Sequence, residues 1–159
     1  MLQQTQVKTV IPYFKKFIQQ CPTLKSLSSS NEEKILKLWE GLGYYRRARN
    51  LLATSKLLVK EFNSKLPQEK KDIKKLPGVG EYTANALLGL VYNKPTIAVD
   101  GNVKRVFLRI LNKKESKVDF EKLIENNKKK LFSTKRNADL VEALMEFGAL
   151  ICKPKEPKC

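Results

Sequence analysis

A short turn with two glycines is the first part of the sequence that could bind a charged ligand. Gly78 and Gly80 lie in the string Leu76-Pro77-Gly78-Val79-Gly80, between two segments with helical patterns. Because glycine has no Cβ, backbone N–H groups can approach a phosphate closely, and a following helix N-terminus adds partial positive charge. Such a turn would contact a phosphate backbone rather than base edges. An ordinary connection between helices is the alternative, and the two flanking helices favour phosphate binding.

Two further segments carry side chains that could contact bases. Residues 41–50 combine a glycine-containing loop with two tyrosines, which can stack on bases, and three arginines, which can contact phosphates. Near the start of the chain, neighbouring amides could hydrogen-bond base edges once a nucleotide is extruded, although a polar helix start would look the same. The candidate contacts in these segments are Gln3, Gln4, Thr5, Tyr44, Arg46 and Arg49.

The residue types restrict the chemistry. The chain has no histidine, so acid–base steps fall to carboxylates, lysine or tyrosine. Its three cysteines, Cys21, Cys152 and Cys159, are an odd number without a secretory signal, which argues against a disulfide framework and indicates a reducing cytoplasm. From spacing alone, Cys152 and Cys159 are interpreted as two reduced thiols and Cys21 as a structural residue.

These groups must be positioned by helices, because the apolar spacing is helical along the chain and no strand alternation competes with it. Apolar residues recur at three- and four-residue steps over 7–18, where Pro12 is expected to kink or restart the helix. Asp100 can cap a helix that runs to about Leu111. Further helices are predicted at about 30–40, 46–62, a segment ending at 76, 82–91, 120–131 and 138–152.

The net charge predicts a polyanionic partner. With 32 Lys+Arg against 16 Asp+Glu, the formal charge is +16, more than solubility requires. No long apolar run, signal peptide or basic amphipathic tail favours a membrane, so nucleic acid is the better prediction, although many lysines can simply solvate helix faces. The length of 159 residues fits one compact unit with room for two lobes.

With these motifs the chain resembles the helix-hairpin-helix DNA glycosylases, the superfamily that includes endonuclease III and the A/G-specific adenine glycosylases, over essentially all 159 residues. The resemblance implies an all-α fold of two helical lobes with a DNA-binding cleft between them, in a single core spanning 1–159. It places the hairpin at 76–84, where Pro77, Gly78, Val79 and Gly80 would hold a DNA phosphate, often with a monovalent cation.

The same resemblance assigns catalytic roles. The stretch 99–103 matches the family's conserved aspartate region, so Asp100 would stabilise the positive charge that develops on the sugar, and Asn102 would position it. Lys104, on the same segment, is expected to contact DNA. Bifunctional members carry a lysine where this chain has Tyr82, which predicts base removal without strand cleavage; packing is the alternative role for Tyr82.

Adenine is the predicted target because residues 1–7 look like the adenine-glycosylase version of this helix. In that group the tyrosine at the position of Tyr44 intercalates beside the 8-oxoguanine opposite adenine. The group's proton-donating glutamate lies two residues before the methionine that is Met1 here, so we expect this chain to be inactive alone. The group's C-terminal domain for 8-oxoguanine recognition is likewise outside the chain.

The resemblance also implies a cofactor. Cys152 and Cys159 have the spacing of the first two of the four cysteines that bind a [4Fe–4S] cluster in the family. The predicted protein is a cytoplasmic base-excision repair enzyme, nucleoid-associated in a bacterium and monomeric, acting on double-stranded DNA with adenine opposite 8-oxoguanine or guanine. The alternatives are a non-catalytic helix-hairpin-helix DNA-binding module and an endonuclease III-like glycosylase/lyase, the latter disfavoured by Tyr82.

Overall fold

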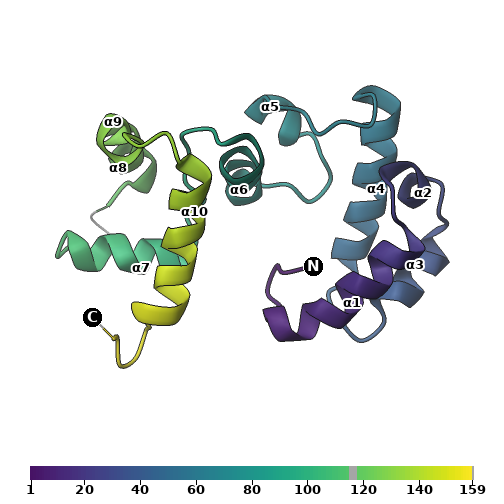
Figure 1. The fold of residues 1–159 in the computed structure, drawn as a ribbon, viewed down its shortest axis with the longest axis horizontal. Coiled ribbons are helices and arrows are strands. Elements are labelled where there is room, and N and C mark those ends of the chain that lie inside the picture. The colour runs from purple at the N-terminus through teal and green to yellow at the C-terminus, as the bar shows by residue number, and fades with distance from the viewer. Residues whose placement is uncertain (115–117, 159) are drawn as a thin grey trace. The chain divides into compact units, whose positions relative to one another are not determined.

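The computed structural model describes residues 1–114 and 118–158, and the regular elements in that part of the chain are all helices. The all-α fold predicted from the apolar spacing is therefore confirmed. The chain divides into two compact units, Met1–Gly78 and Val79–Cys159 (Figure 1). Among the described residues, no helix is both long enough and apolar enough to cross a bilayer.

Unit 1 is built around Trp39, which is only 1% exposed. The edge of the Phe17 ring meets the Trp39 ring at 85° with centroids 6.4 Å apart, an arrangement that aromatic pairs favour. Leu38, Ala48 and Leu52 belong to the same buried cluster. The helices of unit 1 are α1 (Val7–Gln20), α2 (Leu24–Ser28), α3 (Glu32–Trp39), α4 (Arg46–Glu61) and α5 (Lys70–Ile73).

Helix α1 differs from its prediction in two ways. It runs through Pro12 as one helix, so the proline does not restart it. Only one edge of the predicted apolar stripe is buried, at Val10 and Phe17. The other members of the stripe are exposed: Val7, Ile11, Phe14 and Ile18.

Side-chain caps fix where two helices of unit 1 begin. Helix α2, which the apolar spacing did not predict, starts with a capping box between Thr23 and Ser26. At the start of α3 the Asn31 side chain accepts a hydrogen bond from the Lys34 backbone N–H at 2.9 Å. The predicted helix ending at Leu76 is shorter than expected, because α5 ends at Ile73 and Leu76 is buried beyond it.

In unit 2, α10 packs against both α6 and α7, and these three helices bury Leu88, Val106 and Val141. Helices α6 and α10 approach closely at Gly89, where an added Cβ would lie 2.8 Å from Val141 Cγ2. The elements of unit 2 are α6 (Glu81–Tyr92), α7 (Gly101–Ile110), α8 (Phe120–Asn126), α9 (Lys128–Leu131), α10 (Asn137–Glu146) and the π-helix η2 (Phe147–Ile151).

Two predicted helices of unit 2 are each divided in the structure. The segment 120–131 breaks at Asn127, whose backbone (φ −107°, ψ 9°) separates α8 from α9. The segment 138–152 changes at Phe147 from an α-helix to the π-helix η2. Gly148 in η2 lies directly against Asn102, because an added Cβ there would be 2.7 Å from Asn102 Cβ.

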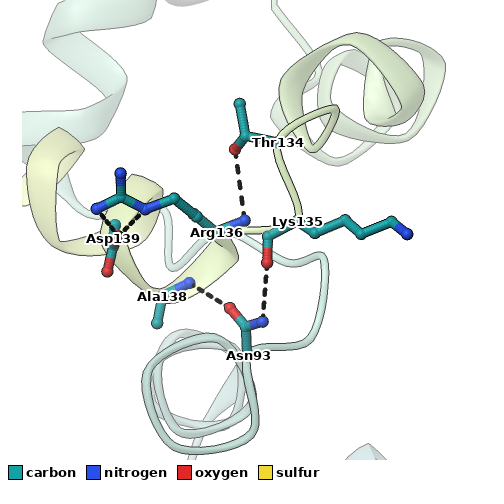
Figure 2. A network of polar contacts seen from close by, with 6 residues as sticks. All are labelled: Asn93, Thr134, Lys135, Arg136, Ala138 and Asp139. Carbon is teal, nitrogen blue, oxygen red and sulfur yellow. Dashed lines mark hydrogen bonds and ion pairs between the residues drawn. The ribbon is translucent and has the colours of Figure 1, made fainter.

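A polar corner joins the end of α6 to the start of α10 (Figure 2). Asn93 ends α6 in a left-handed conformation, φ 51°. Its side-chain Nδ2 donates to the Lys135 carbonyl at 2.9 Å, and its Oδ1 accepts from the Ala138 N–H at 2.9 Å. The Asn93 carbonyl accepts from Asn137 Nδ2 at 2.6 Å. One residue therefore fixes both the end of α6 and the direction of α10.

Candidate active site and nucleic-acid interface

Asp100 is the N-cap of α7, as the sequence predicted. Its Oδ1 accepts a hydrogen bond from the Val103 N–H at 2.8 Å, and its Oδ2 accepts from Asn102 Nδ2 at 3.3 Å. The carboxylate is half-buried and lies at the positive end of the helix. Cap and amide together hold this negative charge in one orientation, which is the requirement for stabilising a developing cation.

Arg105, which was not among the predicted site residues, continues this hydrogen-bond chain. Its Nη2 donates to Asn102 Oδ1 at 2.9 Å and to the Gly148 carbonyl at 2.6 Å, and its Nε donates to the Cys152 carbonyl at 2.8 Å. The guanidinium thus connects Asn102 to η2. The i, i+3 spacing of Asn102 and Arg105 was visible in the sequence, but the contacts with η2 were not.

Tyr82 lies close enough to Asp100 to interact with it electrostatically. Burial, and then the negative charge of Asp100, raise the pKa of the Tyr82 phenol above its ordinary value. The ring is 39% exposed, so the neutral hydroxyl can act as a hydrogen-bond donor. The structure therefore brings together the three residues predicted to be catalytic, Asp100, Asn102 and Tyr82, inside unit 2.

A hollow of about 600 Å³ runs along α7 and begins at Gly101, the residue after Asp100. Its lining is mostly basic and includes Lys104, Arg105 and Arg109. The Lys104 ammonium also lies 5.7 Å from the centroid of the Phe120 ring, in cation–π geometry. Positive charge therefore extends from the carboxylate along the outer face of the helix.

The two hairpin glycines have different roles. Gly78 adopts φ 77°, and a Cβ there would collide with the Asn50 side chain, so the turn requires glycine at this position. Thr54 Oγ1 donates to the Pro77 carbonyl at 3.2 Å, which fixes this half of the turn on α4. Gly80 instead has an extended backbone, φ −91° and ψ −173°, that any residue can adopt.

Gly80 leaves open space at the start of α6. A Cβ on this residue would meet no atom within 4 Å, and no side chain caps the helix there. Val79, which precedes it, is half-buried. An exposed, uncapped helix start without a Cβ matches the predicted phosphate contact, because an anion can approach its backbone N–H groups.

The predicted base-contacting residues lie in unit 1. Tyr44 is 64% exposed and Gln4 is exposed, and both have left-handed backbones, φ 48° and φ 56°. Thr5 Oγ1 donates to the Gln3 carbonyl at 3.4 Å. The two segments are joined by Arg47, one of the three arginines predicted near phosphates, which donates to the carbonyls of Gln3 and, at 3.3 Å, Gly43.

The two predicted arginines of α4 are both exposed. Arg49 Nε forms an ion pair with Glu32 Oε1 at 2.7 Å, with both side chains about half exposed. An exposed pair of this kind contributes little to stability, so Arg49 stays available for exchange to a phosphate. The sequence did not show that Arg47 binds backbone carbonyls, because this residue borders the buried position Ala48 of α4, where only tertiary contacts identify its partners.

The structure describes one of the two cysteines that the resemblance assigns to an iron–sulfur cluster. Cys152 is buried and accepts a hydrogen bond through Sγ from Arg109 Nη1 at 3.2 Å, whereas Cys159 lies outside the described residues. Among the residues that the structure describes, no three His, Cys, Asp or Glu side chains are grouped to hold a metal. Cys21 is buried in the core of unit 1, as a structural residue would be.

Two curated proteins that match the whole chain are named adenine DNA glycosylases. The chain is 44% identical over 159 residues to the adenine DNA glycosylase of Buchnera aphidicola subsp. Baizongia pistaciae (strain Bp), covering all of this chain and 45% of that protein. It is 38% identical over 162 residues to the adenine DNA glycosylase of Homo sapiens, covering all of this chain and 30% of that protein. The chain thus spans less than half the length of these curated relatives.

Solved structures share the fold. A thermostable thymine-DNA glycosylase superposes with a TM-score of 0.83 at 26% identity, covering 99% of this chain and 74% of that one. A non-covalent endonuclease III–DNA complex gives a TM-score of 0.77 at 25% identity, covering 98% and 72%. The family model described as HhH-GPD superfamily base excision DNA repair protein matches residues 1–132. The predicted resemblance is confirmed: the chain belongs to the HhH-GPD superfamily of base-excision DNA repair proteins.

Proposed function

We propose that this chain is the helical core of a monofunctional adenine DNA glycosylase, which removes adenine mispaired with 8-oxoguanine or guanine in double-stranded DNA. The observation that carries the proposal is the oriented carboxylate of Asp100 beside a neutral Tyr82. Two relatives that match the whole chain are named adenine DNA glycosylases, which supports adenine as the base.

In the proposed reaction, the bond between the sugar C1′ and adenine breaks, and its electron pair leaves with the base, which takes up one proton. Asp100 stabilises the cation left on the sugar. Water then adds to C1′ and releases a proton, so a free base and an abasic site result. The chain has no histidine, and we expect the proton donor to be the glutamate that the family pattern places ahead of Met1.

DNA is held, in this proposal, by groups on both units. Gly78, Val79 and Gly80 bind a phosphate, with a monovalent cation there as a further proposal, and the amides and Tyr44 of unit 1 contact the mispair. The net charge of +16 and the basic hollow along α7 support binding to a polyanion. The proposal includes a DNA-binding cleft in a monomeric, cytoplasmic enzyme. It also includes a [4Fe–4S] cluster in the longer protein, with Cys152 and Cys159 among its ligands.

Product analysis tests this proposal. The reading frame that contains the chain, extended upstream of Met1, is incubated with a duplex carrying adenine opposite 8-oxoguanine. We expect free adenine and a strand that breaks only on later alkali treatment, because Tyr82 cannot form the amine adduct that permits strand cleavage. Direct strand nicking would indicate a lyase of the endonuclease III kind. Tight binding without base release would instead favour a non-catalytic module.

A further inference from the structure

Arg47 connects two segments of unit 1 that are about forty residues apart in the sequence. Its Nη1 donates to the Met1 carbonyl at 2.6 Å and to the Gln3 carbonyl. Its Nη2 donates to the carbonyls of Leu42 and Gly43, each at 3.3 Å. A planar guanidinium with several fixed donors can bridge two backbone segments in this way, whereas a single ammonium cannot.

Two aromatic rings hold the guanidinium in place. Its carbon lies 5.5 Å from the Trp39 centroid and 5.4 Å from the Tyr44 centroid, both within cation–π range. Trp39 Nε1 also donates to the Gly43 carbonyl at 3.1 Å, so the loop before Tyr44 is held from two sides. Trp39 is fully buried, whereas Tyr44 remains 64% exposed. Arg47 therefore links the core of unit 1 to an aromatic ring that faces solvent.

Two of the four carbonyls that Arg47 binds belong to residues directly before a strained residue. Gln4 and Tyr44 both have left-handed backbones, φ 56° and φ 48°, which side chains other than glycine rarely adopt. Gln3, whose carbonyl Arg47 binds, comes directly before Gln4, and Gly43 comes directly before Tyr44. Such conformations persist only where surrounding contacts hold them, and they concentrate at functional sites.

The side chain of Arg47 is more buried than that of its neighbour Arg46. Arg47 is half-buried, its Nη atoms are engaged with backbone carbonyls, and its Nε is buried without a partner. Arg46 is exposed on the first turn of α4. A guanidinium whose Nη atoms are bound internally is poorly placed to contact a phosphate, so the positive charge of Arg47 serves the fold of the loop.

We propose that Arg47 is a positioning residue that fixes Gln4 and Tyr44 as a two-part contact to the mispaired bases. The proposal rests on the proposed function, because it assumes that these two residues meet DNA. It assigns to Arg47 no contact with DNA of its own. Loss of Arg47 should therefore remove selectivity for the mispair and leave general DNA binding intact.

The test measures the affinity of the chain for two duplexes, one with adenine opposite 8-oxoguanine and one fully paired, over a range of salt concentrations. Arg47→Met keeps the length of the side chain without its donors, and Arg136→Met, at an exposed arginine of unit 2 that pairs with Asp139, is the matched control. We expect Arg47→Met to lower the preference for the mispaired duplex about tenfold, the size of one lost base contact. The affinity of Arg47→Met should depend on salt concentration as that of wild type does. The loss of a phosphate contact would instead reduce the slope of log affinity against log salt concentration.

Two further measurements separate positioning from unfolding. Trp39 is the single tryptophan of the chain, so its emission should shift in Arg47→Met and stay unchanged in Arg136→Met. Arg47→Lys, which retains the charge and part of the contacts, should recover little of the preference. If Arg47→Met does not fold, Arg47→Lys carries the same comparison, with Arg136→Lys as its control.

The outcomes are distinct. Equal loss on both duplexes with a shallower salt dependence would make Arg47 a phosphate contact and overturn the positioning role. An unchanged preference in a folded variant would overturn it as well. A wild-type chain that does not prefer the mispaired duplex would overturn the proposed function, and the positioning role with it.

Discussion

The negative charge of Asp100 acts on the Tyr82 phenol through space, and both residues take part in the proposed reaction. The phenol keeps its proton because burial and the nearby carboxylate both disfavour the phenolate. A neutral hydroxyl beside Asp100 can donate a hydrogen bond to an oxygen of the substrate without adding charge. A lysine at position 82 would instead bring a nucleophilic amine.

The pKa of Tyr82 is directly measurable. Phenolate absorbance of wild type minus that of Tyr82→Phe should give a pKa above the ordinary tyrosine value of about 10. Asp100→Asn should lower that pKa only part of the way, because burial is the larger cause. Asp139→Asn, which alters an aspartate paired with Arg136, is the control and should leave it unchanged. Identical titrations in wild type and Asp100→Asn would contradict the proximity of Tyr82 and Asp100.

The sign of the effect on stability follows from the same shift. Since the folded pKa of Tyr82 exceeds the unfolded one, the folded state binds more protons once the pH passes the unfolded value. The contribution of this phenol to stability is therefore complete below about pH 10 and is lost as the pH rises through the folded pKa.

At the scale of elements, the two hairpin glycines differ in role: the turn requires Gly78, whereas Gly80 leaves room for a ligand. We predict that Gly78→Ala destabilises the chain by about 1–2 kcal/mol or more, because its backbone is left-handed and Asn50 blocks the Cβ. Gly80→Val should change the free energy of unfolding by less than about 0.5 kcal/mol. Urea unfolding of both variants measures the difference.

Gly80→Val is also predicted to affect DNA binding. Gly80→Val should weaken DNA binding by a similar factor for every sequence, because its side chain would occupy the space proposed for a phosphate. A sequence-selective loss would argue that the hairpin reads bases. Unchanged affinity would remove Gly80 from the proposed interface.

The corner between α6 and α10 is a second element-scale feature that can be tested. Asn93→Gly keeps the left-handed backbone but loses the two side-chain hydrogen bonds, and should cost about 1 kcal/mol. Asn93→Ala should cost about 1 kcal/mol more, because alanine is also strained at φ 51°. Urea unfolding checks the order. Equal stability of the two variants would mean that the backbone conformation contributes nothing.

These elements also show what the sequence could predict. The Asp100 cap and the start of α4 at Arg46 agree with the structure, because capping side chains and apolar spacing act within a few residues. The break at Asn127 and the change to a π-helix at Phe147 were missed. Gly148 packs against Asn102 and accepts from Arg105, and local periodicity does not encode such distant contacts.

The candidate site shows the same contrast between local signals, which the sequence carries, and distant contacts, which it does not. The family resemblance predicted catalytic roles for Asp100, Asn102 and Tyr82; in unit 2, Asn102 donates a hydrogen bond to Asp100, and the charge of Asp100 acts on Tyr82. The contacts of Arg47 were not identified, because they involve carbonyls at Met1 and Gln3 that lie far away in the sequence. Side chains that bind backbone carbonyls leave no pattern of residue types, since every residue has a carbonyl.

At the scale of the whole molecule, excess positive charge and an oriented negative charge serve different steps. The net charge of +16 favours association with DNA of any sequence, and that association should weaken as salt rises. In the proposed reaction, Asp100 acts only after a base is extruded, when positive charge develops on the sugar. Binding and catalysis should therefore respond to different substitutions, with the hairpin affecting the first and Asp100 the second.

Single-turnover release of adenine by the upstream-extended protein, compared between wild type and Asp100→Asn, separates these steps. We predict a rate at least about 100-fold lower in Asp100→Asn, as expected when one preorganised electrostatic group is removed from a transition state. Affinity for the mispaired duplex, measured in parallel, should remain close to wild type. Adenine release at the wild-type rate by Asp100→Asn would contradict the catalytic role of this carboxylate.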